Sequence, residues 1–456
     1  MTGTNFSSRQ VWASDIDIAA RIEKGMSWVL KQTVEYQKNK YCFTSGTGKP
    51  DEGEVSSEDN ARVALSLSSY HMYLTSDKHD AWLKASLEFV LESQAVTRDF
   101  HRYYDTKKEQ WVSSGSFYFW NAHIAALLVQ TAFTMRRLPE GFVGHEFWDR
   151  IIQSVESCID PWMESNMRTD GSWILVYPDS RPVQTGDVGM ILNALSCLSG
   201  YEKMWKNGDR ADRYSKAAQR TCGWVVSKQE MNPSSWGYGG YYDDDSRTVQ
   251  TALSNGRAMF GLLSYWAFIG LTIPDPDYDL LRKSMIAWTE GFVAKMTDHY
   301  GGPGEGRTEP ATFLYPKKTL AAAEFIRDLT LIWVNLGGAR YWSLAEMTYK
   351  WLVGSNEMSI DLQQMNDTDT TNGSFFSGIE NDTYMDQKST IETTSQCIDA
   401  MLNAMSIHIP ELSHPYSMTF LIVAASSVLL SLKRRKRNLP LTDGLYEPGF
   451  QKSSLV

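Results

Sequence analysis

The chain has 456 residues, of which 42% are hydrophobic and 21% charged, a balance typical of folded globular proteins that excludes wholesale disorder. Its formal net charge of −10 disfavours nucleic acid as a partner, because neutralising phosphates requires a basic face. The five cysteines include no Cys-x-x-Cys pair and no zinc-site spacing. We therefore predict buried free thiols, no metal site and no cofactor.

A helical pattern of apolar residues begins at Asp15, and no segment shows a clear run of alternating strand residues. The sequence therefore predicts an all-α fold. The twelve predicted helices span residues 15–36, 57–74, 77–94, 117–136, 144–165, 185–205, 210–229, 247–269, 277–298, 318–336, 341–354 and 390–407. The polar residues 1–13 before them are predicted to be disordered.

The even-numbered helices share an opening. Asn60, Asn121, Asp187 and Asn255 each begin a three-residue segment that precedes an apolar run, at intervals of roughly 60–70 residues. A similar step lands near Glu324, and one more lands near Gln396. The even helices are rich in Ala, Gly, Ser and Leu and are predicted to be buried, whereas the odd helices are more charged and resemble an outer layer. Such repeats bury their faces only by stacking on one another.

In this pattern residues 14–408 resemble an (α/α)6 toroid, in which six inner helices are ringed by six outer ones. This is the architecture of terpenoid cyclases, protein prenyltransferases and six-hairpin carbohydrate enzymes. A solenoid of helical pairs is the structural alternative. Six hairpins is the number that closes the ring, which favours the toroid.

A partial repeat motif agrees with this fold. Asp170-Gly171-Ser172-Trp173 resembles the Gly-x-Trp end of the repeat motif of squalene-cyclase-like proteins, although Met167 replaces its glutamine. A second copy, from Gln229 to Trp236, matches less well. The resemblance implies a structural role, in which such motifs tie the outer helices together, and carries no catalytic role.

The functional cavity of such a toroid is expected where loops enter the inner helices, because unpaired N–H groups and the positive helix dipole gather there. Polar residues at those positions are predicted to converge on a central funnel. Those with an expected catalytic role are His123, Asp187 and Glu324, and those expected to bind substrate are Asn60, Arg62, Asn121, Asn255 and Arg257, with Arg327 nearby. Local capping is the alternative for each of them.

Three consecutive carboxylates, Asp243, Asp244 and Asp245, stand before the fourth even helix. One of them is a natural helix cap. Mutual repulsion in a cleft would instead raise at least one pKa, which suits a catalytic acid. The Asp-x-Asp-Asp acid motif of terpenoid cyclases is not matched, because Tyr242 stands where its first aspartate would be.

Aromatic residues crowd the same loops. Flat rings there would stack on sugar rings or stabilise a carbocation, and packing on the toroid rim is the alternative. The expected binding residues are Trp120, Trp173, Trp236, Tyr238, Tyr241 and Tyr242. The glycine-rich loop from Tyr300 to Arg307 is expected to form a rim or lid, and it lacks the ending of a phosphate loop.

Three functions stay open. The first is a carbohydrate-active enzyme, a glycoside hydrolase or polysaccharide lyase, in which Asp187 and one of Asp243–Asp245 or Glu324 form the carboxyl pair. The second is a terpenoid-cyclase-like or prenyltransferase-like enzyme. The third is a non-catalytic ligand-binding or surface protein. A glycan or another small molecule is the expected ligand, and the sequence does not indicate an oligomeric state.

The C-terminal part is predicted to be membrane-bound. After a linker at 409–416, residues 417–432 are uncharged and apolar and predict one transmembrane helix, and the basic run that opens the tail at 433–456 places this tail in the cytoplasm. The main domain would then be extracytoplasmic, in weak agreement with sequons at Asn366, Asn372 and Asn381. No signal peptide is visible, so another export route, a misassigned start and an internal tail-anchored domain remain alternatives.

Overall fold

The computed structural model describes most of the chain between Asp15 and Ser406. The described residues are 15–45, 53–112, 115–136, 145–206, 209–273, 276–309, 311–365, 372–381 and 384–406. The predicted disordered N-terminus, the linker, the membrane span, the basic tail and the sequon at Asn366 lie outside them. None of the described helices combines the length and the apolar character that a membrane span requires. The membrane anchor therefore stays a prediction.

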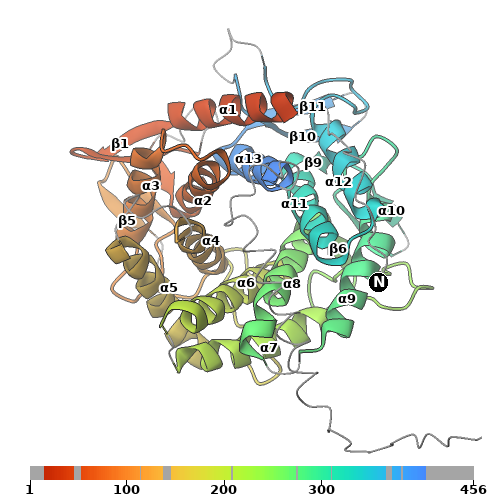
Figure 1. Ribbon diagram of the computed structural model, residues 1–456, viewed down its shortest axis with the longest axis horizontal. Helices are drawn as coiled ribbons and strands as arrows, with labels where there is room; N and C mark the ends of the chain where they lie inside the picture. Colours follow the sequence, from red (N-terminus) through yellow and green to blue (C-terminus); the bar gives the residue numbers. More distant parts are fainter. Residues whose placement is uncertain are drawn as a thin grey trace, which may run out of the picture.

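Two concentric rings of helices make up the fold (Figure 1). The inner ring consists of α2 (Ser57–Leu74), α4 (Phe119–Met135), α6 (Thr185–Tyr201), α8 (Ala252–Thr272), α11 (Thr319–Leu336) and α13 (Ile391–Ser406). The outer ring consists of α1 (Asp15–Lys31), α3 (Asp80–Glu92), α5 (His145–Ser165), α7 (Arg210–Ser227), α9 (Tyr278–Ala287) with its continuations η2 (Trp288–Val293) and α10 (Ala294–Met296), and α12 (Ala339–Leu352). A further π-helical turn, η1 (Glu202–Lys206), extends α6. The predicted toroid of helical hairpins is confirmed.

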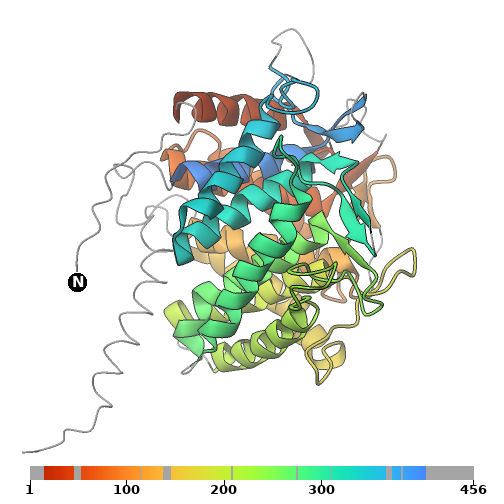
Figure 2. The ribbon, with the colours of Figure 1, turned by 90° about the vertical axis from the view of Figure 1, so that its right-hand side faces the viewer.

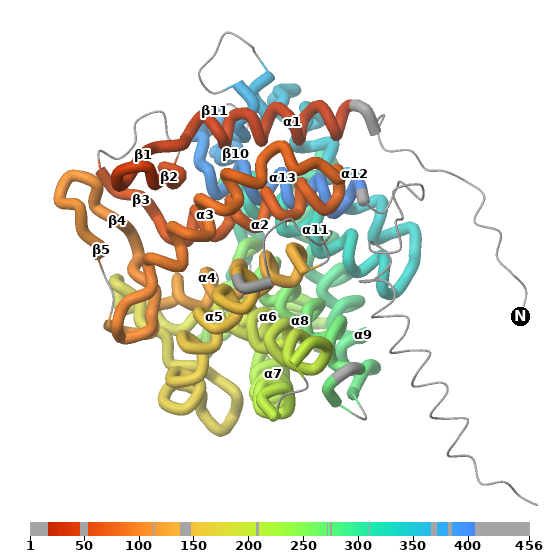
Figure 3. The backbone as a smooth tube through the Cα atoms, turned by 60° about the vertical axis from the view of Figure 1, so that its left-hand side comes forward, coloured from red at the N-terminus to blue at the C-terminus, as the bar shows by residue number. Residues whose placement is uncertain are grey.

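The ring is closed by contacts between its last and first hairpins. Ser66 Oγ on α2 donates to the carbonyl of Ser395 on α13 at 2.9 Å, and Ser69 Oγ donates to Asp399 Oδ1 at 2.9 Å. Figure 3 shows α13, in blue, beside α2, in orange. A solenoid would leave these two helices far apart, so that alternative is excluded.

Small residues let the inner helices approach one another closely. Every residue of α6 is buried. A Cβ added to Gly261 on α8 would lie 2.2 Å from the carbonyl oxygen of Gly189 on α6. The two backbones therefore touch directly, which explains why the even helices carry so much Gly, Ala and Ser.

The described part of the chain also contains four small antiparallel sheets, which the sequence did not predict. The strands pair as β1 (Thr33–Gln37) with β2 (Lys40–Phe43); β3 (Glu54–Ser56), β4 (Tyr103–Asp105) and β5 (Gln110–Val112); β6 (Val249–Thr251), β7 (Gly306–Thr308) and β8 (Ala311–Phe313); and β9 (Lys317–Lys318), β10 (Phe376–Asn381) and β11 (Tyr384–Ser389). Most of them have only two to five residues, which is too short for an alternating pattern to stand out. Strands β3, β6, β9 and β11 come immediately before inner helices, so the sheets gather on one face, the right-hand side of Figure 2.

The Gly-x-Trp motif has the structural role that its resemblance implied. Gly171 has a φ of +88°, and a Cβ there would lie 2.1 Å from the carbonyl oxygen of Arg220 on outer helix α7. Trp173 Nε1 donates to Thr221 Oγ1 on the same helix at 3.0 Å. The same turn, with a positive φ and a carbonyl of the next outer helix close by, recurs at Gly239, Gly301 and Gly373.

We expect Gly171→Ala to destabilise the fold by about 2 kcal/mol or more, since a left-handed alanine is strained and its methyl group would overlap a backbone oxygen. Gly223→Ala is the matched control. Gly223 lies inside α7, and a Cβ there meets nothing within 4 Å, so this change should stabilise by about 0.5–1 kcal/mol. Urea unfolding of the two variants measures both, and an equal effect of the two would contradict the assignment.

All five cysteines are buried and none forms a disulfide, which confirms the predicted free thiols. Burial raises the pKa of the thiols of Cys42, Cys158, Cys222 and Cys397. These groups are therefore held as neutral, unreactive thiols.

Candidate functional site at the centre of the ring

Charged side chains from five of the six inner helices meet where these helices begin. We call this group the central cluster. It consists of Glu58 and Arg62 on α2, His123 on α4, Asp187 on α6, Arg257 on α8 and Glu392 on α13. The predicted convergence of inner-helix openings therefore occurs for Arg62, His123, Asp187 and Arg257.

A chain of three hydrogen bonds runs through the cluster. Tyr177 Oη donates to Asp187 Oδ2, His123 Nε2 bonds Asp187 Oδ1, and His123 Nδ1 bonds Glu58 Oε1, each at 2.8 Å. Burial alone would lower the pKa of His123, but the charge of Glu58 and the bonds from both carboxylates raise that pKa. With a carboxylate on each nitrogen, the ring is held as an imidazolium that donates twice.

Two arginines link the other side of the cluster. Arg62 Nη2 lies 3.5 Å from Oε1 of both Glu58 and Glu392. Arg257 Nη2 lies 3.4 Å from Glu392 Oε1, and its Nη1 lies 3.7 Å from Asp187 Oδ1. Three cationic side chains thus balance three carboxylates. The side chains of Glu58 and Glu392 are 19% and 32% exposed, so the cluster reaches solvent through these two carboxylates.

Glu58 and Asp59, neighbours in the chain, have opposite protonation. Burial would raise the pKa of Glu58, but His123 and then Arg62 and Arg257 lower it to about 2. Burial, followed by the nearby charge of Glu392, raises the pKa of Asp59 to about 7, although Ser45 Oγ donates to its Oδ2 at 2.8 Å. Below about pH 7 Glu58 is ionised while Asp59 keeps its proton, which is the arrangement of an acid–base pair.

An aromatic wall borders the cluster. The rings of Phe119 and Tyr177 are stacked with centroids 5.3 Å apart and an interplanar angle of 8°. The Phe119 ring also meets His123 edge-on at 5.7 Å. The guanidinium of Arg181 lies 5.2 Å from the Phe119 centroid and 4.7 Å from that of Tyr177. Both rings belong to the aromatic loops in which the sequence predicts residues that stack on a sugar.

The asparagines of the shared opening hold loops in place and do not reach the cluster. Asn60 exchanges hydrogen bonds with both backbone groups of Phe43, and Asn255 does the same with Tyr241. Asn121 accepts from the backbone N–H of Phe100. Of the four openings compared, three begin with asparagine and one begins with Asp187. Asp187 is also the one of these four residues whose side chain belongs to the cluster.

The three consecutive aspartates form no hydrogen bond or ion pair with the central cluster among the described residues. Asp243 is buried and accepts from the backbone N–H of Thr251, the N-cap of α8, at 2.9 Å. Burial raises the pKa of Asp243 to about 6, with Asp244 a minor cause. The Asp244 side chain accepts from Ser246 in its own turn. The Asp245 side chain is 82% exposed and pairs with Lys228.

Glu324 belongs to a second buried group on α11. It forms an ion pair with Arg327, and Arg327 donates to Asp328 Oδ1 at 2.8–3.0 Å. Burial, with the charge of Glu324, raises the pKa of Asp328 to about 8 despite Arg327. This group is not joined to Asp187 by any hydrogen bond or ion pair among the described residues.

The predicted aromatic binders pack into the rim. Trp120 Nε1 donates to Phe100 O, Tyr241 Oη bonds Ser284 Oγ, and Tyr242 Oη donates to Glu230. Trp173 donates a hydrogen bond to Thr221, Trp236 packs edge-on against the Tyr242 ring, and the ammonium of Lys295 lies over the Tyr238 ring. The structure brings none of these six into contact with the central cluster.

The loop from Tyr300 to Arg307 contains strand β7, whose Arg307 is 2% exposed. Its guanidinium donates to Gln250 Oε1 and to the carbonyl oxygens of Gly237, Tyr238 and Gly291 at 2.7–3.1 Å. The end of the loop that was expected to be a rim or lid is therefore anchored firmly.

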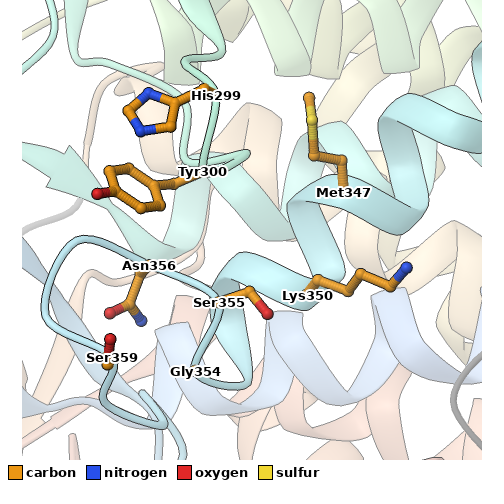
Figure 4. A pocket seen from close by; sticks show the side chains of 8 residues that line it. All are labelled: His299, Tyr300, Met347, Lys350, Gly354, Ser355, Asn356 and Ser359. Atoms are coloured by element: carbon orange, nitrogen blue, oxygen red, sulfur yellow. The ribbon is translucent and has the colours of Figure 1, made fainter.

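One surface hollow lies elsewhere. It has a volume of about 470 Å³ and lies between the residues after α10 and the end of α12 (Figure 4). It is lined by His299, Tyr300, Met347, Lys350, Gly354, Ser355, Asn356 and Ser359. None of these residues belongs to the central cluster, so this hollow is separate from the candidate site.

Sequence reasoning missed Glu58, Asp59 and Glu392. All three lie in the first turn of an inner helix, where acidic side chains are common because they favour the helix dipole. Their position therefore looked ordinary. The one available signal was that α2 and α13 each carry such an acid a few residues before Arg62 or Gln396, in openings already expected to face the axis. Within the described residues, no group of three or more His, Cys, Asp or Glu side chains is placed to hold a metal ion.

No known family profile and no curated protein matches the sequence. Solved structures do match. A cellobiose 2-epimerase from Spirochaeta thermophila aligns with a TM-score of 0.62 over 86% of this chain and 97% of its own, at 13% identity. A β-1,3-1,4-glucanase from Paenibacillus aligns with a TM-score of 0.56 over 88% and 96%, at 10% identity. The chain has the fold of the six-hairpin sugar enzymes.

A polysaccharide lyase also shares this six-hairpin fold, with a TM-score of 0.53 over 85% of this chain and 97% of its own, at 13% identity. The predicted resemblance to six-hairpin enzymes is thus confirmed. At such identities the likeness concerns the fold alone, and the chemistry has to be argued from the side chains at the centre of the ring.

Proposed function

We propose that the protein is a carbohydrate-active enzyme of the hydrolase or lyase type, with its active site at the central cluster. The observation that carries the proposal is the contrast between Glu58 and Asp59, whose pKa values of about 2 and about 7 give an ionised and a protonated carboxyl on consecutive residues of α2. Cleavage of a glycosidic bond needs one group of each kind. The fold shared with sugar epimerases, lyases and glucanases supports the same class.

In the hydrolytic form of this reaction, Asp59 gives its proton to the glycosidic oxygen as the C–O bond breaks. The ionised carboxylate of Glu58 stabilises the positive charge that develops on the sugar ring. A water molecule then adds its hydroxyl to the sugar and returns a proton to Asp59. The stacked rings of Phe119 and Tyr177 offer a surface beside the cluster against which a sugar can pack.

The relay of hydrogen bonds behind Glu58 supports this assignment. Asp187 holds His123 by one nitrogen, so the other nitrogen points at Glu58 and keeps that carboxylate ionised. Because both ring nitrogens of His123 are bonded to carboxylates, this histidine is not free to remove a proton from a sugar. The geometry therefore favours bond cleavage over epimerisation.

The ionic character of the cluster bears on the other functions. A terpenoid cyclase needs an apolar, aromatic cavity to shield a carbocation, whereas charged side chains occupy this centre. A non-catalytic binding protein has no need of a buried carboxyl held protonated near neutral pH, since that arrangement costs stability.

The direct test is a screen of the purified chain against polysaccharides and synthetic glycosides, run beside Asp59→Asn. Turnover by the wild type and none by the variant supports the proposal. Glycan binding without any turnover by either protein would show the ligand-binding function instead.

The raised pKa of Asp59 also predicts that the stability of the folded chain depends on pH. An unfolded aspartate ionises near pH 3.8, whereas the pKa of folded Asp59 is about 7. Between these values the folded chain holds a proton that the unfolded chain has lost, so stability falls as the pH rises from about 4 to about 7. We expect Asp59→Asn to melt about 1–4 °C above the wild type at pH 8 and level with it at pH 4.

Calorimetry at the two pH values checks this, with Asp245→Asn as the control. The exposed Asp245 should change the melting temperature little at either pH. A wild type that is as stable as Asp59→Asn at pH 8 would show that Asp59 ionises normally.

A further inference from the structure

Three polar side chains of the inner ring share one position. Arg62 on α2, Arg257 on α8 and Gln396 on α13 each come two residues after a side chain that pins the preceding loop to its helix. The pinning residues are Asn60, Asn255 and Thr394. This shared position aims the three side chains at the centre of the ring, where Arg62 donates to Gln396 Oε1 and both arginines approach Glu392.

These side chains have hydrogen-bond donors left over. Arg62 Nε, Arg257 Nε and Gln396 Nε2 are buried, and none has a hydrogen-bond partner among the described residues. Arg62 and Gln396 are each only 2% exposed. A buried donor without an acceptor costs about 1–3 kcal/mol. Three of them at one place indicate a site built to receive a ligand rich in acceptors.

Glu392 shows which acceptor fits. Its Oε1 lies 3.5 Å from Arg62 Nη2 and 3.4 Å from Arg257 Nη2, so one carboxylate oxygen already bridges the two guanidinium groups. Glu392 is in the first turn of α13 and its side chain is 32% exposed, so it can turn toward solvent without moving the helix. The site would then hold two arginines and His123 against Glu58 and Asp187, which is one positive charge in excess.

We propose that the sugar unit bound at the centre of the ring carries a carboxylate, as a uronic acid does, and that Arg62, Arg257 and Gln396 bind this group in place of Glu392. This rests on the proposed function and names its substrate class. A single negative charge restores the balance of the cluster. A phosphate monoester would bring a second negative charge, and a neutral sugar would leave the one excess positive charge of the cluster unbalanced.

Titration calorimetry of the full-length chain tests this with D-glucuronate and D-galacturonate against glucose, galactose and glucose 6-phosphate. We expect the uronates to bind at least about tenfold more tightly than the neutral sugars and the phosphate. Arg257→Lys keeps the charge but loses the planar fork, and should reduce the preference for uronates by about tenfold. Melting curves establish that this variant is folded.

Glu392→Gln provides a test with the opposite sign. Removing the internal carboxylate removes a competitor, so the affinity for uronates relative to the affinity for glucose should rise about fivefold to tenfold. Unchanged or weaker uronate binding in Glu392→Gln, or equal binding of glucuronate and glucose by the wild type, would overturn the inference.

The two proposals fail in different ways. If the protein cleaves neutral glycosides in a way that depends on Asp59 and shows no preference for uronates, the proposed enzymatic function stands and the proposed acidic substrate is wrong. If the protein binds uronates in a way that depends on Arg257 but cleaves no uronic-acid polymer, the proposed binding site stands and the proposed catalytic function is wrong.

Discussion

Replacing Asp59 by asparagine should lower kcat/KM on an alkyl glycoside by about 10²–10⁴-fold, the usual contribution of a general acid. The amide keeps the size of the side chain and still accepts from Ser45 Oγ, which donates to Asp59 at 2.8 Å in the wild type. It has no acidic proton to give to the leaving oxygen. The loss should therefore fall mainly on kcat, with KM changed little.

Asp245→Asn is the matched control for this substitution. It makes the same chemical change in an exposed carboxylate that belongs to the run of three aspartates, and kcat/KM should stay at the wild-type value. Wild-type kcat in Asp59→Asn, or an equal loss in both variants, would remove Asp59 from the reaction. Steady-state kinetics on the same glycoside measures both.

Replacing Arg307 should have the largest effect on stability. Its guanidinium is buried without a carboxylate partner among the described residues, and carbonyl and amide oxygens surround it. Burial lowers the pKa of Arg307 to about 10. Arg307→Ala removes one donor from each of these oxygens, and we expect a loss of about 3–5 kcal/mol in the free energy of unfolding.

Arg307→Lys separates geometry from charge. A lysine keeps the positive charge, but a single ammonium cannot reach acceptors that a planar fork spans, so most of the loss should remain. Arg213→Ala is the control, because Arg213 is 38% exposed and pairs with Glu164 at the surface, and it should cost less than about 1 kcal/mol. Urea unfolding compares the three, and a fully stable Arg307→Lys would show that the hydrogen-bond geometry is unimportant.

The ring could be predicted because its physical cause is visible in the sequence. An inner helix such as α6 is buried on every face, and its content of small and apolar residues shows this directly in the sequence. The turn at Gly171 leaves a Gly-x-Trp trace for the same reason, since another side chain would strike Arg220 O. The strands left no trace, because β6 and its partners are held by backbone hydrogen bonds between loops that are distant in the sequence.

The site was predictable only in part. Arg62, His123 and Arg257 could be found because they follow one register, which gives their side chains a common direction. Asp187 could be found because it stands two residues earlier in its opening, where the other three openings carry asparagine. Asp243, Asp244 and Asp245 lie in a loop, where neighbouring side chains point in unrelated directions.

Glu58, Asp59 and Glu392 are hidden for a different reason. An acid in a first helical turn is explained equally well by the helix dipole. The folded ring separates the two carboxyls chemically: burial, followed by the charge of Glu392, raises the pKa of Asp59, whereas His123 lowers the pKa of Glu58 against the effect of burial.

Asp59, in the first turn of inner helix α2, is the proposed acid that protonates the leaving group of a sugar. The most direct measurement compares wild type and Asp59→Asn on two glycosides of the same sugar, one with an alkyl alcohol and one with dinitrophenol as the leaving group. Dinitrophenolate departs without a proton. We expect Asp59→Asn to lose about 10²–10⁴-fold in kcat/KM on the alkyl glycoside and less than about tenfold on the dinitrophenyl glycoside. Equal losses on both would contradict it.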